Sequence, residues 1–390
     1  MPDTAAAVVS PRGAHRLVRG HPWVFRSDVD GRPDAAAGVV PIYDGHGRPL
    51  GWGLWRPRSE IALRLLDSAP GARIDGAWWM TRIATALARR EAVSRDSSAY
   101  RVVHGEADGC PSLVCDRYDR WLVVQLMSAG LEACRSDIVA ALQDAMQPLG
   151  ILARHDAAVR RKEGLDETVE VLAGDVPTEI EIVEHGVRYL AAPWSGQKTG
   201  AFLDQRENRA LMGELARGRA LDCFSYHGSF ALHLARRAAH VTALDSSAAA
   251  LARAADNATL NGATNITFVE DDAFTYLKSA ERSRARFDIV VLDPPAFAKT
   301  RASVGAALRG YQEINLRGMR LLEPGGLLYT ASCSHHVSRA AFLDMLATAA
   351  GDSGRRLALR RVLGQASDHP EVLSIPETGY IKGALVEALD

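Results

Sequence analysis

The sequence predicts an α/β protein in which a doubly wound, mostly parallel Rossmann-like sheet follows two smaller domains. From about residue 191 to the end of the 390-residue chain, short apolar runs alternate with helical segments. This alternation is typical of βαβ units in a parallel sheet. Residues 1–72 instead hold short extended pieces between turn signals, and residues 73–190 mix a helical stretch with strands. Three domains are therefore expected, with boundaries near residues 72 and 190.

The first region, residues 1–72, is predicted to be a small β-rich domain. Its turn signals include Gly38, Gly47 and Gly53, and apolar and polar residues alternate at 61–65. It carries nine arginines against seven acidic residues. Arginine binds phosphate oxygens through paired hydrogen bonds. The domain is therefore a candidate phosphate-binding surface, although the excess of charge alone slightly favours an ordinary solvated β-barrel surface.

The second region, residues 73–190, is predicted to be a central α+β domain. A helical stretch covers 77–92 and a strand covers 121–126, while two strands at 179–183 and 187–190 are joined by a turn. Its three cysteines are Cys110, Cys115 and Cys134. They leave a zinc or iron–sulfur site short of ligands, so no metal is expected.

The third region, residues 191–390, carries the alternation that predicts the doubly wound sheet. Five apolar runs predict successive strands at 219–224, 241–245, 266–270, 287–292 and 327–331. Two last strands, at 357–363 and 381–387, have no long helix between them. They are expected to pair antiparallel as an edge hairpin.

Composition limits the classes of protein to which the chain can belong. A net charge of −1 argues against a general coat for nucleic acid or for a membrane surface, so an RNA partner would have to meet local basic patches. No apolar run is long enough to span a membrane, and the alanine-rich start at 5–9 lacks the features of a signal peptide. Five cysteines, an odd number, fit reduced thiols. A cytoplasmic protein is expected.

Acidic residues at three strand ends predict a nucleoside pocket. Gly228 follows the first strand at the start of a helix, where backbone amides can meet a ligand. The loop lacks the three-glycine dinucleotide fingerprint, which disfavours NAD. Asp245 suits a ribose diol, and Asp272 suits the adenine amine. Each acid alone is more often a helix cap, but together with Asp293 they favour a ligand at the strand ends.

Two further strand ends offer a carboxylate and a thiol. Asp293-Pro294-Pro295 follows one strand, and Cys333 follows the next between two serines. A carboxylate with stiff residues behind it suits a planar base, and a thiol beside it suits covalent attack on that base. Cys333 has polar neighbours, so we interpret it as a nucleophile rather than as a buried structural thiol. Cys223 lies within an apolar strand and is expected to be inert.

These motifs resemble the RlmI-type large-subunit rRNA cytosine-5 methyltransferases. The resemblance runs nearly end to end: residues 20–25 look like the family's N-terminal RNA-binding PUA domain, and residues 105–109 and 160–165 look like its central domain. The motifs of the last domain are residues 197–206, 223–226, 293–297, 332–334 and 365–370. Such an ordered series is highly specific for the family and less so for the target nucleotide.

The resemblance implies S-adenosylmethionine as the methyl donor. The residues expected to bind it are Lys198, Thr199, Asp204, Gln205, Arg206, Phe224, Ser225, Tyr226, Gly228, Asp245, Asp272 and Asp293. Two departures from the family pattern are visible, because His227 and Ser229 stand where Thr and Gly are usual. They put contacts near the methionine tail of the cofactor in doubt.

The implied reaction forms 5-methylcytosine in 23S rRNA. Carbon 5 of cytosine is a poor nucleophile, so the Cys333 thiolate adds first at carbon 6. Asp293 bonds the base, and Pro294, Pro295 and Phe297 are expected to contact it. RNA is the expected partner, and the sequence leaves a homodimer open. Two alternatives remain: an rRNA guanine-nitrogen methyltransferase, which needs no cysteine, and a non-catalytic RNA-binding assembly factor, which needs no methyl donor.

Overall fold

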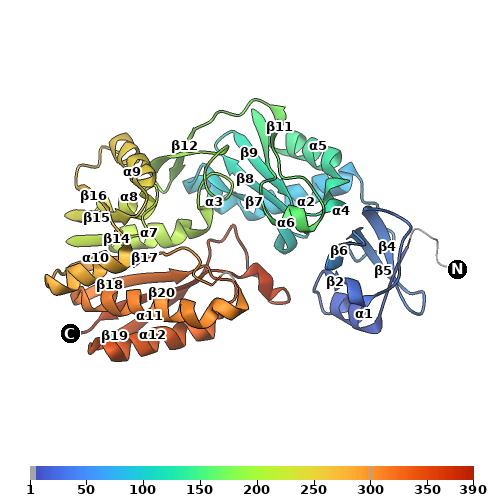
Figure 1. Cartoon of the computed structure of the whole chain (residues 1–390). Coiled ribbons are helices and arrows are strands. Elements are labelled where there is room, and N and C mark those ends of the chain that lie inside the picture. The colour runs from blue at the N-terminus through green and yellow to red at the C-terminus, as the bar shows by residue number, and fades with distance from the viewer. Residues whose placement is uncertain (1–5, 299) are drawn as a thin grey trace. The chain divides into compact units, whose positions relative to one another are not determined.

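The computed structural model describes residues 6–298 and 300–390 and forms two compact units (Figure 1). The first unit runs to Glu184 and also includes Leu190–Leu203 and Ser367–Thr378. The second comprises His185–Tyr189, Asp204–Ala366 and Gly379–Asp390. Part of the alanine-rich start lies outside the described residues. Within the described residues, every helix is too short or too polar to cross a membrane.

The first unit begins with a six-stranded sheet in the order β2-β6-β5-β4-β1-β3. Its strands are β1 (Ala7–Val9), β2 (Trp23–Phe25), β3 (Val29–Gly31), β4 (Gly38–Asp44), β5 (Pro49–Trp55) and β6 (Ile61–Asp67). The β-rich character is as predicted, but the helix α1 (Pro11–Val18) was missed. Ser10 caps it by accepting a hydrogen bond from the Gly13 amide, and Pro11 occupies the first turn. Ser-Pro before a helical stretch is a recognisable start signal.

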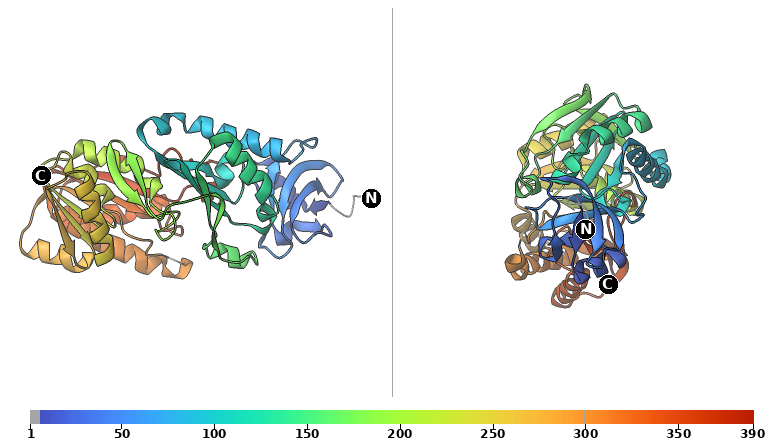
Figure 2. Two further views of the ribbon diagram at one scale, coloured as in Figure 1. Left: turned by 90° about the horizontal axis from the view of Figure 1, so that it is seen from above. Right: turned by 90° about the vertical axis from the view of Figure 1, so that its right-hand side faces the viewer.

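The central part of the first unit is a five-stranded sheet in the order β11-β10-β9-β8-β7. The strands are β7 (Ala99–His104), β8 (Leu113–Tyr118), β9 (Trp121–Leu126), β10 (Gly150–Arg154) and β11 (Val169–Gly174). The helices are α2 (Gly76–Arg89), α3 (Glu91–Asp96), α4 (Ala129–Glu132), α5 (Arg135–Met146) and α6 (Val159–Lys162). Helices α2 and α5 pack against each other and share the core of the sheet (Figure 2). The predicted hairpin forms a separate two-stranded sheet of β12 (Ile180–Glu184) and β13 (Val187–Ala191), of which His185–Tyr189 belongs to the second unit.

The second unit is built on a seven-stranded sheet in the order β16-β15-β14-β17-β18-β20-β19. Its strands are β14 (Arg219–Cys223), β15 (His240–Asp245), β16 (Ile266–Glu270), β17 (Phe287–Leu292), β18 (Leu322–Ser332), β19 (Leu357–Leu363) and β20 (Lys382–Ala388). The first five run parallel to one another, and the predicted parallel sheet is confirmed. The last two strands pair antiparallel, as predicted. Of these two strands only β19 lies at an edge of the sheet, however, because β20 lies between β18 and β19.

Helices cover both faces of this sheet. They are α7 (Arg206–Leu215), α8 (Ser229–Ala235), α9 (Ala248–Leu260), α10 (Ala273–Arg282), α11 (Val304–Arg320) and α12 (Arg339–Ser353). Helices α10, α11 and α12 bury side chains such as Leu277, Tyr311 and Phe342 in one core, while α7 and α8 bury Met212 and Phe230 in another. The fold is therefore a three-layer, doubly wound α/β sandwich, as the alternation of strands and helices predicts.

Candidate active site

The strand order reverses between β14 and β17, which are neighbours in the sheet. In doubly wound sheets, ligands bind beyond the carboxyl ends of the strands at such a switch point. The loop 224–228 follows β14, and Asp293 follows β17 directly. The predicted nucleoside and base motifs therefore meet at this edge of the sheet.

The loop after β14 has a backbone shape that exposes its amides. Phe224, Tyr226 and Gly228 all have positive φ values, of 64°, 50° and 83°. A side chain on Gly228 would also meet the Cβ of Ala254 at 3.0 Å, so glycine is needed there. Left-handed residues outside glycine are strained and cluster at functional sites. The loop therefore has the geometry expected of a ligand-binding turn at the start of a helix.

Asp245 is held in place by the loop after β14. Its Oδ2 accepts a hydrogen bond from the Tyr226 amide and its Oδ1 accepts one from the Ser247 amide, both at 2.9 Å. Each carboxylate oxygen has a second lone pair, so the side chain can still accept the two hydroxyls of a ribose diol. Asp272, by contrast, does not end β16 but caps α10, because its Oδ1 accepts from the Thr275 amide at 3.0 Å.

Asp222, on β14, is an acidic residue that sequence reasoning missed. Its side chain is almost completely buried, and its Oδ2 accepts from the Ala231 amide at 2.9 Å while its Oδ1 has no hydrogen-bond partner among the described residues. Burial raises the pKa of Asp222 well above its usual range, and the carboxylates of Asp293 and Asp245 raise it further. The residues around it are apolar, as in an ordinary buried strand, so the sequence pattern did not single out Asp222 as a functional residue.

The buried oxygens near this loop fit S-adenosylmethionine. The hydroxyl of Ser225 is buried and, like Asp222 Oδ1, makes no hydrogen bond within the described residues. Buried polar groups are normally satisfied, so such groups point to an absent partner. The methionine tail of the cofactor carries an ammonium and a carboxylate, which suit an acid and a hydroxyl. Asp245 would then hold the ribose.

The Asp293 carboxylate is oriented by the side-chain amide of a glutamine. Gln205 Nε2 donates to Asp293 Oδ1 at 2.9 Å, and the Gln205 Oε1 accepts from the Tyr329 hydroxyl at 2.8 Å and from Asn208 Nδ2 at 2.6 Å. The predicted residues Gln205 and Asp293 are thus brought together. These hydrogen bonds fix the orientation of the Asp293 carboxylate.

One tyrosine ties the Asp293 loop to the end of β18. The Tyr311 hydroxyl is 2.9 Å from Ser334 Oγ, which also accepts from the Ala298 amide at 3.0 Å. The Phe297 ring lies against the Tyr311 ring, with centroids 4.6 Å apart. Phe297, which is predicted to stack on a planar base, is half-buried. The two motifs predicted to handle that base are therefore neighbours.

The two cysteines at strand ends differ in exposure. Cys333 is partly exposed, and its Sγ is 4.0 Å from the carbonyl oxygen of Pro294. Cys223 is completely buried, and burial raises its pKa well above the usual value. A buried thiol with a raised pKa is a poor nucleophile. Cys223 is therefore the less reactive of the two by its burial, and the role of Cys333 as the nucleophile stays a prediction.

The predicted loop 197–206 divides between the two units. Thr199 belongs to the first unit, where its hydroxyl donates to Asp116 and its side chain is buried. Lys198, also in the first unit, lies over the Phe202 ring at 4.7 Å. Their role in cofactor binding stays a prediction.

The other half of that loop belongs to the second unit. Asp204 accepts a hydrogen bond from the Tyr380 hydroxyl at 2.7 Å. Arg206 begins α7, is buried and pairs with Glu207 at 3.0 Å. Both residues are thus engaged within the protein.

The two departures from the family pattern are both buried. His227 stacks on Tyr189 with ring centroids 5.3 Å apart, and its carbonyl oxygen accepts from Asn257 Nδ2 at 2.9 Å. Ser229 is the first residue of α8.

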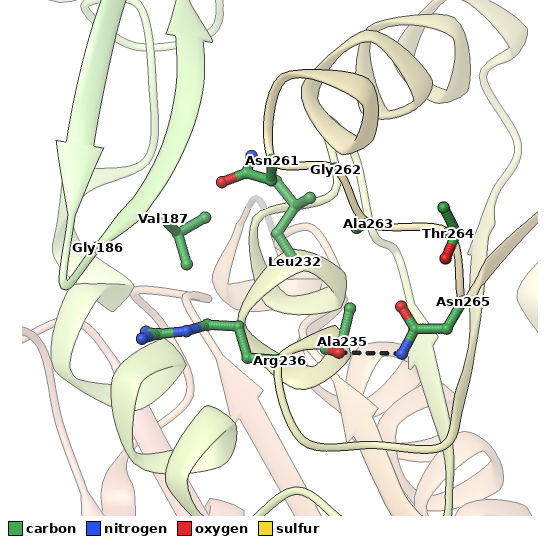
Figure 3. A pocket seen from close by; sticks show the side chains of 10 residues that line it. All are labelled: Gly186, Val187, Leu232, Ala235, Arg236, Asn261, Gly262, Ala263, Thr264 and Asn265. Carbon is green, nitrogen blue, oxygen red and sulfur yellow. Dashed lines mark hydrogen bonds between the residues drawn. The ribbon is translucent and has the colours of Figure 1, made fainter.

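A separate cavity lies at the amino edge of the same sheet. It measures about 280 Å³ and is lined by residues that include Gly186, Arg236 and Asn265. Figure 3 shows Asn265, which precedes β16, donating to the carbonyl oxygen of Ala235 at 2.9 Å. None of the predicted site residues lines this cavity. It is therefore distinct from the site at the carboxyl edge.

Comparison with known proteins defines the class. Residues 101–373 match the family model described as S-adenosylmethionine-dependent methyltransferase, and residues 7–68 match a PUA-like domain. Two solved structures share the fold: a candidate SAM-dependent methyltransferase from Streptococcus mutans (TM-score 0.81, 20% identity, 97% of this chain and 99% of that one) and a candidate methyltransferase complexed with SAH (0.82, 20%, 97% and 99%). The chain belongs to the S-adenosylmethionine-dependent methyltransferases, and S-adenosylmethionine is its cofactor.

Curated relatives narrow the family further. The chain is 40% identical over 384 residues to "Ribosomal RNA large subunit methyltransferase I" of Tolumonas auensis, covering 96% of both chains. It is 37% identical over 395 residues to the protein of the same name from Pseudoalteromonas atlantica, covering 99% of this chain and 100% of the relative. The chain belongs to the family of these proteins, as its motifs predict.

Proposed function

We propose that this protein methylates carbon 5 of a cytosine in 23S rRNA through a covalent adduct of Cys333. The observation that carries the proposal is the partly exposed Cys333 at the end of β18, with its sulfur against the Pro294 carbonyl of the base-handling loop. The names of its curated relatives support large-subunit ribosomal RNA as the substrate.

Each residue at the strand ends then has a distinct task. S-adenosylmethionine, when bound, supplies an electrophilic methyl group. The Cys333 thiolate adds to carbon 6 of the base and raises the electron density at carbon 5. Asp293, oriented by Gln205, bonds the base near N3 or N4, and Phe297 offers a stacking face. Loss of the carbon 5 proton then allows the thiolate to leave, which restores the double bond.

The first unit supplies surface for the RNA. Arg12 and Arg16 on helix α1 and Arg19 at its C-cap follow one another at helical spacing, so they lie on one face. Arg16 lies over the Phe25 ring at 4.6 Å, while Arg12 pairs with Asp28 at 2.6 Å. An arginine face of this kind suits RNA phosphates. A homodimer and a cytoplasmic location stay predictions.

Two other functions are tested by the same experiment. A guanine-nitrogen methyltransferase needs no thiol, because a nitrogen acceptor has its own lone pair. A non-catalytic assembly factor needs neither the thiol nor a turnover of the cofactor.

The test compares the two cysteines. Cys333→Ala is expected to abolish methyl transfer while S-adenosylmethionine and RNA binding remain, and Cys223→Ala is expected to keep all three. RNA containing 5-fluorocytosine should trap the wild-type protein covalently through Cys333, because fluorine does not leave as the proton does. The trapped peptide is identified by mass spectrometry. Robust methylation by Cys333→Ala would favour the guanine-nitrogen alternative, and absence of any transfer by the wild type on rRNA would favour the assembly factor.

A further inference from the structure

Lys382 is a buried cation beside the proposed nucleophile. It is the first residue of β20 and pairs in antiparallel register with Ser332, the last residue of β18. Directly opposed residues of an antiparallel pair lie on the same face of the sheet. From there the Lys382 ammonium reaches beyond the end of β18 and donates to the Ser334 carbonyl oxygen at 2.7 Å. Lys382 therefore pairs with the residue before Cys333, Ser332, and donates a hydrogen bond to the residue after it, Ser334.

No carboxylate neutralises this ammonium within the described residues. Lys382 is only 6% exposed. Its two hydrogen bonds there go to neutral carbonyl oxygens, those of Ser334 and of Tyr380, the second at 2.8 Å. An ammonium has three donors, so one N–H remains uncommitted. Burying a charge without a counter-ion is costly, and proteins keep such an arrangement where it serves a function.

Among the described residues, Cys333 is the one group whose negative charge, once its thiol is ionised, would favour the protonated form of Lys382. Burial lowers the pKa of Lys382 to about 8, while the thiolate opposes that shift and the guanidinium of Arg339 adds to it. Lys382 therefore keeps its proton in most molecules at neutral pH. The other titratable groups around the thiol are the Tyr311 hydroxyl and the exposed His335 and His336.

We propose that Lys382 is a positioning residue for the nucleophile, in that its buried ammonium holds the Cys333 side chain as a thiolate before the RNA base arrives. This inference rests on the proposed function of Cys333. In the resting enzyme the thiol gives its proton to solvent water, and the ammonium keeps its own three protons. After attack on carbon 6 the sulfur becomes a neutral thioether. When the product leaves, the electron pair of the carbon–sulfur bond returns to sulfur, where the ammonium again stabilises it.

Thiol alkylation tests the proposal without methyl transfer. The rate at which iodoacetamide labels Cys333 is measured against pH by peptide mass spectrometry in the full-length protein. Lys382→Met is expected to raise the apparent pKa of the Cys333 thiol by about one unit or more, because a neighbouring cation favours the thiolate. At a pH below both values, labelling should then slow by about tenfold. Lys382→Arg, which keeps the charge, should restore most of the rate.

Two controls make the result decisive. Lys278→Met removes an exposed lysine from α10 and should leave the labelling profile unchanged. Lys382→Gln keeps a donor for the Ser334 carbonyl but loses the charge, so it should behave like Lys382→Met even if the methionine variant folds poorly. Retained S-adenosylmethionine binding, at the switch point between β14 and β17, reports that each variant is folded.

The outcomes separate this inference from the proposed function. An unchanged Cys333 labelling profile in folded Lys382→Met and Lys382→Gln would overturn the role of Lys382, whether or not Cys333 is needed for methylation. A raised thiol pKa supports it, even if Cys333→Ala proved active and the cytosine-5 assignment failed. Methyl transfer that falls in Lys382→Met and returns in Lys382→Arg would show that the charge of Lys382 is needed for the proposed reaction of Cys333.

Discussion

The five-stranded sheet of the first unit and the carboxyl edge of the second unit's sheet both bury carboxylates, but with different partners. Asp108 is held by two hydrogen bonds of 2.6 Å from Arg90, and Asp116 by bonds of 2.7 and 2.8 Å from Arg101. Asp222, in the second unit, is as deeply buried but accepts one backbone amide and leaves one oxygen without a partner among the described residues.

This difference in hydrogen-bond partners distinguishes buried acids that stabilise the fold from a buried acid that is expected to bind a ligand. In the first unit the segment Ser367–Thr378 joins the paired charges, since Arg101 donates its amide to Asp368 at 2.7 Å and Arg90 donates to the Asp368 carbonyl oxygen at 2.9 Å. A buried charge with a complete set of partners is explained by the fold itself. A buried acid that lacks partners costs stability in the folded protein and is expected where a ligand completes it.

Breaking a complete pair should have the largest effect. Asp108→Ala is expected to lower the free energy of unfolding of the first unit by about 3–5 kcal/mol, because it leaves the buried Arg90 guanidinium unpaired. All seven tryptophans lie in the first unit, so urea denaturation followed by tryptophan fluorescence reports on this unit alone. Asp256→Ala, at an exposed position on α9, is the control. A loss below 1 kcal/mol would mean that the pair is not a structural necessity.

At the incomplete site the effect should appear in ligand affinity. Asp245→Ala is expected to weaken S-adenosylmethionine binding by about 1.5–3 kcal/mol, the range for a hydrogen bond to a charged group. The fold should survive, because the amides that Asp245 accepts from lie in exposed or half-exposed backbone. Isothermal titration gives the affinity, and Asp256→Ala again serves as the control. Unchanged binding would place the ribose elsewhere.

The arginine face at α1 is expected to contribute to the salt dependence of RNA binding. Arg19→Gln is expected to reduce the slope of log affinity for RNA against log salt by about 0.7–0.9, the loss of one phosphate contact. Arg48→Gln is the control, because Arg48 is already paired with Asp44 at 3.0 Å. Point changes are preferable to deletion of residues 1–72. Leu54 and Leu66 of that region share a core with Trp79 and Ile83, so deletion would expose apolar surface. Equal slopes for wild type and Arg19→Gln would mean that Arg19 makes no contact with an RNA phosphate.

The sequence was sufficient wherever local patterns determine structure. The strands 266–270, 287–292 and 357–363 have the predicted bounds, because each is an apolar or alternating run between clear breaks. Asp245 and Asp293 could be placed because they end such runs. The partners of these residues could not be predicted. Lys382 reaches the end of β18 only because β20 lies between β18 and β19, and strand order is a property of the whole sheet.

Buried polar positions were the second failure. Asp222 lies inside a strand and shows no pattern of its own, and Gln205, just before a helix, was predicted only through the family resemblance. Their importance comes from burial and from partners distant in sequence, as when Gln205 meets Asp293 and Tyr329. Asp272 was placed at a strand end, whereas its hydrogen bond to Thr275 shows a helix cap. A strand-end acid and a helix cap have the same sequence signal.

The smallest expected effect concerns Asp222 and its pH dependence. Its pKa in the folded protein is raised, chiefly by burial, so the folded state holds this proton more tightly than the unfolded state does. Stability from the protonated form is complete below the ordinary carboxyl pKa and is lost as pH rises toward the raised value. Asp222→Asn stays neutral throughout. In cofactor-free protein the variant should match the wild type near pH 4 and become the more stable of the two as pH rises.

Saturating S-adenosylmethionine should reverse that order. The ammonium of the cofactor would provide the charged partner that Asp222 lacks, so ligand should stabilise the wild type more than Asp222→Asn. Unfolding of the second unit is followed by loss of cofactor binding and by far-ultraviolet circular dichroism, with and without ligand. If Asp222→Asn is no more stable than the wild type in cofactor-free protein at neutral pH, the buried acid is not strained. If ligand stabilises both proteins equally, Asp222 does not face the methionine tail of the cofactor. The incomplete set of partners around Asp222 would then be a feature of the fold and not of the cofactor site.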